Sequence, residues 1–530
     1  MRMTSRRRTW MTIAALAGLS TLALARSKSP RPDERKRKIG APSPARVYDF
    51  SADSVMGEMS ATAGGAKDIT FFRDRVGTGE IPHPNVFTPE GLLSEHDLPL
   101  KAGKGCTKLF CAVGEAGEAS LIAQPEVRWL AQLGFESSLS DATFKRAPLN
   151  LIAVIDKSGS MSGQPLELVK DSLRQVVAAH LKPGDRLGIV LYGDRSHVHL
   201  APTPIEKRAD IDASIDAIES AGSTAMEEGL KVGFDLARSS SKDFKGTTRV
   251  MLFTDERPNV GATDAASFMG MAEAASKAGI GMTTIGVGVQ FGAELATKIA
   301  GVRGGNLYFF GDLGKMKQTF KDDFDTFVTE LAYDLELVVT PAPGLKIAGV
   351  YGIPNNLLEW MPGTTGAIKL QVKTIFLSRR AGGIFVGLTP AGPSNLPVAK
   401  PAVGKSMATV GLSFTPRGKP RTTGAADLTL VAQDKRSLGL VRGSLLVDEA
   451  TSLKAATTLH HEKNDQEGAY RIIHALAGLL RSNNDADLAN ERKLIFDLER
   501  TLAKLSGHQG EPAPVKAPSV DPVSSLPPRP

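Results

Sequence analysis

Short apolar runs alternate with segments of helical periodicity between residues 149 and 331, and this alternation limits the possible folds more than any other feature. Leu149–Ile155 is almost uniformly apolar, as is typical of a strand that is buried on both faces of a sheet. The pattern continues with expected strands at 186–192, 249–254, 280–287 and 306–310 and expected helices at 166–177, 206–218, 224–239, 263–278 and 313–331. It predicts an α/β fold with a doubly wound, mostly parallel sheet and flanking helices.

Oxygen-bearing side chains follow the expected strands. Asp156, Ser158 and Ser160 lie on the turn after the first strand, Asp255 ends the strand at 249–254, and Thr224 precedes a helix. In an open α/β sheet, ligands bind beyond the carboxyl ends of the strands. These five hard oxygen donors suit Mg²⁺, with Ca²⁺ or Mn²⁺ as alternatives, better than Zn²⁺ or copper. Each residue alone would be an ordinary helix cap or turn former, but the joint occurrence of all five favours a metal site.

The five residues resemble the metal-dependent adhesion site of the von Willebrand factor A domain family, which reads Asp-x-Ser-x-Ser, then Thr, then Asp. The resemblance covers about 149–332, and the whole chain is similar to bacterial exported proteins of the calcium-activated-chloride-channel-like type. It implies that Ser158, Ser160 and either Thr224 or Asp255 contact the metal directly, while Asp156 and the remaining residue act through water. It also implies an open coordination position for the acidic side chain of a protein partner.

Two further features bear on this resemblance. The family usually has Gly after the second Asp, whereas this chain has Glu256, which we expect to face solvent or pair with Arg257. An exchange of metal ligation between Thr224 and Asp255 could couple the metal to the closing helix, as in the switchable members of the family. That coupling is a hypothesis, and a designed cross-link on the closing helix that left metal and partner affinity unchanged would exclude it.

The beginning of the chain is read as an export signal. Basic residues precede an apolar run from Met11 to Ala25, and Ala23-Leu24-Ala25 is a small-residue cleavage site, so 1–25 is expected to be a signal peptide, with an uncleaved anchor or a twin-arginine signal as alternatives. The first 38 residues carry a net charge of +9, which leaves −2 for the rest of the chain. The basic pI of about 9.2 therefore does not indicate a nucleic-acid surface.

The regions around the expected α/β domain differ in composition. We expect a disordered basic linker at 26–45 and a disordered Pro-rich tail at 509–530. Irregular sequence with short strands is expected at 46–148, an antiparallel β-sandwich at 333–440, and a helical region with a hairpin of two helices at 441–508. The strands of the irregular region lack partners of their own, so we expect them to pack against the sandwich.

Other motifs carry weaker signals. Cys106 and Cys111 can close a disulfide loop in an oxidising compartment, and two isolated thiols are the alternative. His460-His461-Glu462 lacks the second His of a zinc-protease helix. Gly301, Gly304 and Gly305 form a Gly-rich turn without the Lys-Ser/Thr of a P-loop. His197 and His199 alternate on an expected edge strand and are more typical of surface residues than of ligands.

The sequence thus predicts an exported, non-enzymatic protein that binds a protein partner through a divalent cation, in the periplasm, the cell envelope or outside the cell. One rival is an envelope assembly scaffold in which the metal is purely structural; chelation distinguishes the two, because only the adhesion site would lose its partner. The second rival is a hydrolase, which loss of activity on substitution of His461 or Glu462 would support. Membrane contact is expected only through an uncleaved signal.

Overall fold

The computed structural model describes residues 60–63, 69–101, 105–139, 144–223, 225–255, 264–287, 302–310, 313–364, 366–378, 381–392, 401–508 and 526–527. The expected signal peptide and basic linker lie outside these residues, as does most of the Pro-rich tail. Across the described ranges, no helix combines the length and apolar character needed to cross a bilayer.

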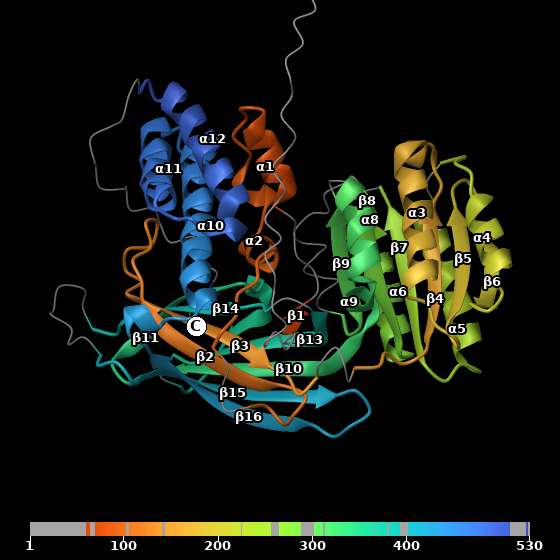
Figure 1. The fold of residues 1–530 in the computed structure, drawn as a ribbon, viewed down its shortest axis with the longest axis horizontal. Helices are drawn as coiled ribbons and strands as arrows, with labels where there is room; N and C mark the ends of the chain where they lie inside the picture. Colours follow the sequence, from red (N-terminus) through yellow and green to blue (C-terminus); the bar gives the residue numbers. More distant parts are fainter. Residues whose placement is uncertain are drawn as a thin grey trace, which may run out of the picture. The chain divides into compact units, whose positions relative to one another are not determined.

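The α/β region contains a six-stranded sheet with the order β6–β5–β4–β7–β8–β9 (Figure 1). Its strands are β4 (Leu149–Asp156), β5 (Arg186–Tyr192), β6 (His197–Pro204), β7 (Thr247–Thr254), β8 (Ile280–Val287) and β9 (Gly305–Phe310). All neighbours run parallel except the edge strand β6, which pairs antiparallel with β5. This arrangement confirms the predicted mostly parallel sheet, and β4 is uniformly buried because it lies in the interior of the sheet.

Helices cover both faces of this sheet. They are α3 (Gln164–Ala179), α4 (Arg208–Asp216), α5 (Met226–Ser241), α6 (Asp264–Lys277), α8 (Leu313–Asp322) and α9 (Phe324–Val328). Successive side chains of a strand point to opposite faces. Leu151 and Ala153 accordingly share a core with α3, α4, α8 and α9, whereas Ile152 and Val154 share a second core with α5 and α6. The two cores give the sheet its layered architecture.

The closing helix differs from the expectation of one helix over 313–331. It divides into α8 and α9, and a strand begins at Glu330. Asp323 stands between the two helices, and aspartate is a poor interior residue because its side chain competes for backbone hydrogen bonds. The β-branched residue Thr329 then adopts extended backbone.

The second sheet has ten strands in the order β1–β13–β10–β15–β16–β2–β3–β14–β11, with β12 paired to β13. The strands are β1 (Ser60–Ala63), β2 (Cys111–Glu118), β3 (Trp129–Glu136), β10 (Glu330–Pro341), β11 (Leu345–Tyr351), β12 (Leu358–Trp360), β13 (Ile368–Ser378), β14 (Ile384–Pro390), β15 (Ser406–Pro416) and β16 (Thr422–Leu430). The pairing is antiparallel except between β2 and β16.

A β-sandwich was expected at 333–440 with the strands of the irregular region packed against it, whereas in the structure three strands of that region are part of the same sheet. β1, β2 and β3 belong to the same sheet, and β2 and β3 join β16 to β14. Leu133 and Leu388 from one part of the sheet share a core with Leu337 and Leu370 from another. Strands from before and after the α/β domain form one sheet because the backbone N–H and C=O groups at the edges of one set of strands are paired by the other set.

A helical region packs on this sheet. It contains α10 (Leu438–Glu462), α11 (Gln466–Arg481), α12 (Ala489–Leu505), α1 (Thr70–Gly77) and α2 (Pro89–Ser94). Short 3-10 turns lie at Pro84–Val86, Gly159–Met161, Asn355–Leu357, Gln433–Lys435 and Ala486–Leu488. The expected hairpin corresponds to α11 and α12, and the long helix α10 lies largely within the expected helical region 441–508, whereas α1 and α2 in the expected irregular region were not anticipated. Phe72, Phe385 and Leu446 belong to one core that unites these helices with the sheet.

Candidate metal centre

Four of the five predicted metal ligands lie together beyond the carboxyl edge of the six-stranded sheet. Asp156 ends β4, Ser158 and Ser160 lie on the turn that follows, and Asp255 comes directly after β7. The Oγ atoms of Ser158 and Ser160 are 3.1 Å apart, and Ser160 donates to Asp255 Oδ1 at 3.0 Å. The adjacent strands β4 and β7 bring these side chains together, since parallel neighbours end at the same edge.

Asp156 anchors the cluster. The side chain is fully buried, and its Oδ1 accepts the backbone N–H of Ser158 at 2.9 Å. Its Oδ2 accepts hydrogen bonds from Tyr192 at 3.2 Å and Thr254 at 3.0 Å. Both carboxylate oxygens are therefore already engaged, which suits a residue that holds the turn in place and reaches a cation through water.

The segment before Thr224 is fastened to the same turn. Gly159 N–H donates to Gly222 O at 3.1 Å, and Ala221 N–H donates to Lys157 O at 2.7 Å. Asp194 accepts the Ser223 backbone N–H at 2.7 Å, and this bond holds the pKa of the Asp194 carboxyl below its usual range. Thr224 itself lies outside the described residues, as do Glu256 and Arg257.

The electrostatics of the cluster favour a cation. Burial raises the pKa of Asp255; the hydrogen bond from Ser160 opposes this shift, and the nearby Asp156 carboxylate adds to it. Two carboxylates and two hydroxyls thus lie in one hydrogen-bonded set that includes no basic side chain. In the described part of the chain, no three His, Cys, Asp or Glu side chains are grouped to hold a metal, so this centre depends on its serines. Such hard oxygen donors fit Mg²⁺, Ca²⁺ or Mn²⁺.

Sequence reasoning did not anticipate the roles of Tyr192 and Thr254. Both end strands that neighbour β4, and both donate to the Asp156 carboxylate. Their position at strand ends was visible in the sequence. The order of the strands, which places β5 and β7 on either side of β4, was the missing information.

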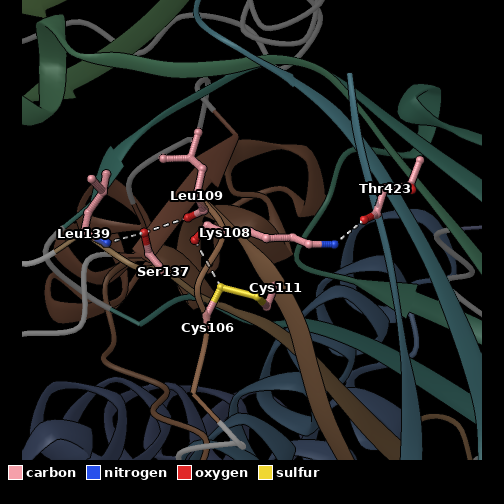
Figure 2. Close-up of a disulfide and its surroundings, with 7 residues drawn as sticks. All are labelled: Cys106, Lys108, Leu109, Cys111, Ser137, Leu139 and Thr423. Atoms are coloured by element: carbon pink, nitrogen blue, oxygen red, sulfur yellow. Dashed lines mark hydrogen bonds between the residues drawn. A yellow bond between two sulfur atoms is a disulfide. The ribbon is translucent and has the colours of Figure 1, made fainter. Parts of the chain in front are cut away.

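The predicted disulfide is present in the structure: Cys106 and Cys111 are joined, with a Cα–Cα distance of 5.7 Å (Figure 2). It closes the short loop before β2. Lys108 in this loop donates from Nζ to Thr423 O at 2.8 Å, which connects the loop to β16. Phe110 is buried in the core of the ten-stranded sheet. The disulfide therefore constrains the loop from which Lys108 reaches β16 and Phe110 enters the core.

The histidines have structural partners. His461 contacts Ile81 O through Nε2 at 2.8 Å, and His460 contacts Gln466 Oε1 through Nδ1 at 2.5 Å. Both lie in the last turn of α10. His199 contacts Ser214 O at 2.8 Å on the edge strand β6, next to an exposed His197. His199, His460 and His461 thus each contact an oxygen atom of the chain itself.

A doubly wound sheet with this oxygen cluster beyond its carboxyl edge is the architecture of a von Willebrand factor type A domain. The family model of the von Willebrand factor type A domain matches residues 150–322, and the chain therefore contains such a domain.

Several known proteins are similar to parts of this chain. The uncharacterized protein sll0103 of Synechocystis is 28% identical over 42% of this chain and 53% of its own length. The uncharacterized protein YfbK of Escherichia coli is 30% identical over 35% of this chain and 32% of its own length. The chain thus spans about half or less of these relatives. A solved von Willebrand factor type A protein from Catenulispora acidiphila is 17% identical, with a TM-score of 0.43 over 77% of this chain and 89% of that chain.

Proposed function

We propose that this protein is an exported, non-enzymatic binding protein that engages a protein partner through a divalent cation, with Mg²⁺ as the resident ion. The observation that carries the proposal is the chain of hydrogen bonds from Asp156 through Ser158 and Ser160 to Asp255 at the open edge of the sheet. When bound, the cation supplies a Lewis-acidic position that accepts an oxygen ligand from outside the chain.

The charge balance supports an acidic partner. The cluster offers two neutral hydroxyls beside two carboxylates, and Asp156 already accepts three hydrogen bonds, so few negative charges contact the ion directly and its charge is incompletely compensated. Ser160 is exposed, which leaves one side of the cluster open to solvent and to a ligand. A Glu or Asp side chain of a protein partner provides the hard, negatively charged oxygen that such an ion prefers.

Export is supported by the leader sequence and by the disulfide. The apolar run at 11–25 and its small-residue cleavage site are those of a secretory signal. The pairing of Cys106 with Cys111 suits an oxidising compartment such as the periplasm or the cell exterior.

The test is calorimetric titration of Mg²⁺ and Ca²⁺ into the full chain and into Ser160→Ala. Ser160 is exposed, so its substitution removes one ligand hydroxyl without opening the core. We expect affinity to fall about 10- to 100-fold, as for the loss of a hydrogen bond to a charged group. Asp156→Ala should abolish binding, and Asp235→Ala, an exposed carboxylate on α5, should leave it unchanged.

Equal metal affinity in the wild type, Ser160→Ala and Asp156→Ala would contradict the site. If the metal binds as expected but a partner stays bound after chelation, the ion is structural and the scaffold interpretation replaces adhesion.

A further inference from the structure

Trp360 lies at the end of the short strand β12 and contacts a distant segment of the chain. Its indole Nε1 donates a hydrogen bond of 2.9 Å to the backbone oxygen of Pro527, which lies 167 residues further along the chain. Trp360 is only 8% exposed. Because β12 pairs with β13 alone among the described strands, Trp360 lies at the margin of the ten-stranded sheet, where a second segment can reach it.

The contact has an apolar part as well. Leu526 packs against the core cluster that contains Trp360, and Leu357 from the turn before β12 does the same. Leu526 and Pro527 are both half-buried. The segment Leu526–Pro527 therefore combines an apolar anchor with a backbone acceptor, and Trp360 offers the matching surface and donor.

The prolines of the tail restrict its backbone in a way that favours this contact. Leu526 precedes Pro527, and Pro527 precedes Pro528, so both residues are restricted to extended or polyproline backbone before they dock. Proline has no N–H group, so covering Pro527 leaves no backbone donor unpaired. Aromatic grooves that bind proline-rich segments use the same combination of a preformed extended peptide and polar contacts to its carbonyl groups.

We propose that the face of β12 around Trp360 is a binding site for a Leu-Pro segment, and that the chain's own Leu526–Pro527 occupies it as a releasable latch. Leu526 and Pro527 both keep part of their surface exposed, which makes the contact reversible. Because the latch is part of the same chain, its local concentration is on the order of mM, which keeps the site closed against weak competitors. This proposal does not depend on the metal centre.

The experiment measures binding of a fluorescein-labelled peptide with the sequence of residues 522–530 by anisotropy. We compare the full-length wild type, Leu526→Ser, and Leu526→Ser combined with Trp360→Phe. Leu526→Ser should bind the peptide about tenfold more tightly than the wild type, because its own tail no longer competes. Trp360→Phe in that background should lower the affinity about tenfold, because phenylalanine keeps an aromatic ring and loses the N–H donor. A peptide with Ser in place of its Leu serves as the control.

Equal peptide affinity in the wild type and Leu526→Ser would overturn the latch, and equal affinity with and without Trp360→Phe would overturn the site. A wild-type dimer that Leu526→Ser dissociates in light scattering would show that the tail of a second copy is the occupant, which would overturn latching within one chain.

A second measurement follows the Trp360 side chain itself and does not depend on Leu526→Ser. The chain contains three tryptophans, so 5-fluorotryptophan labelling gives few ¹⁹F resonances, and Trp360→Phe assigns the relevant one. Its chemical shift should change when the chain ends at His508 and return when the free peptide is added. An unchanged shift would overturn the proposal.

Discussion

Asp448 lies in the middle of α10, where it is 2% exposed. Its Oδ1 accepts the backbone N–H of Ile122 at 2.7 Å and the hydroxyl of Ser452 at 3.4 Å. Burial raises the pKa of the Asp448 carboxyl from 3.8 to about 7, because desolvation disfavours the charged form more than these two bonds favour it. The folded protein must therefore keep this acid protonated or hold a buried charge.

The raised pKa of Asp448 lowers the free energy of unfolding as the pH rises. Below pH 3.8 the group is protonated in both states and has no cost. As the pH rises to about 7, the unfolded chain releases the proton and the folded chain retains it, so stability is lost over this window. A shift of about 3 pKa units corresponds to about 4 kcal/mol once the pH exceeds the folded value.

Asp448→Asn keeps an oxygen acceptor and removes the titration. We expect the free energy of unfolding of the variant, relative to the wild type, to increase by about 4 kcal/mol between pH 4 and pH 8. Its new amide donors add a constant cost of about 1–3 kcal/mol if they lack a partner, so the change with pH is the informative quantity. Urea unfolding at several pH values measures it.

Asp434→Asn is the control, because the Asp434 side chain is 74% exposed. Unfolding free energies of Asp448→Asn and the wild type that run parallel from pH 4 to pH 8 would refute the reasoning. They would mean that the carboxyl is hydrated or better paired than the structure indicates.

Further predictions concern the buried ion pair and the disulfide. Arg249 is fully buried and donates to Glu330 at 2.9 Å, so Arg249→Met should leave a buried carboxylate uncompensated and lower stability by about 3–5 kcal/mol in urea unfolding; a loss below about 1 kcal/mol would contradict this. Replacing Cys106 and Cys111 by serine should lower stability by about 2 kcal/mol, the chain-entropy value for so short a loop, and the wild type in reductant should match the variant.

The α/β region shows how much local pattern can predict. The limits of β5 and β8 coincide with the expected 186–192 and 280–287, because largely apolar runs of strand length between helical patterns have few alternative structures. The extent of β16, which spans Thr422–Leu430, was less predictable. Its first part alternates between half-buried and exposed positions, so hydrophobicity alone does not mark where it begins.

The site was predictable because its residues stand at strand ends. The expectation that Asp156, Ser158, Ser160 and Asp255 converge needed only the rule that parallel strands present their carboxyl ends at one edge. The environment of Asp156 was not predictable in the same way. Tyr192 and Thr254 reach it from neighbouring strands, and their donation depends on strand order and side-chain direction.

The amino-acid sequence by itself determined the class of the α/β domain, the residues of its candidate metal centre and the periodicity of the C-terminal hairpin. Only the tertiary structure decided that β2 and β3 complete a sheet built mainly from residues beyond 330, that α1 and α2 pack with the C-terminal helices, and that Leu526 returns to the core beside Trp360. Hydrophobic periodicity records which face of an element is buried. It does not record which distant segment covers that face, because pairing depends on the combined fit of backbone hydrogen bonds and side-chain packing across the whole chain.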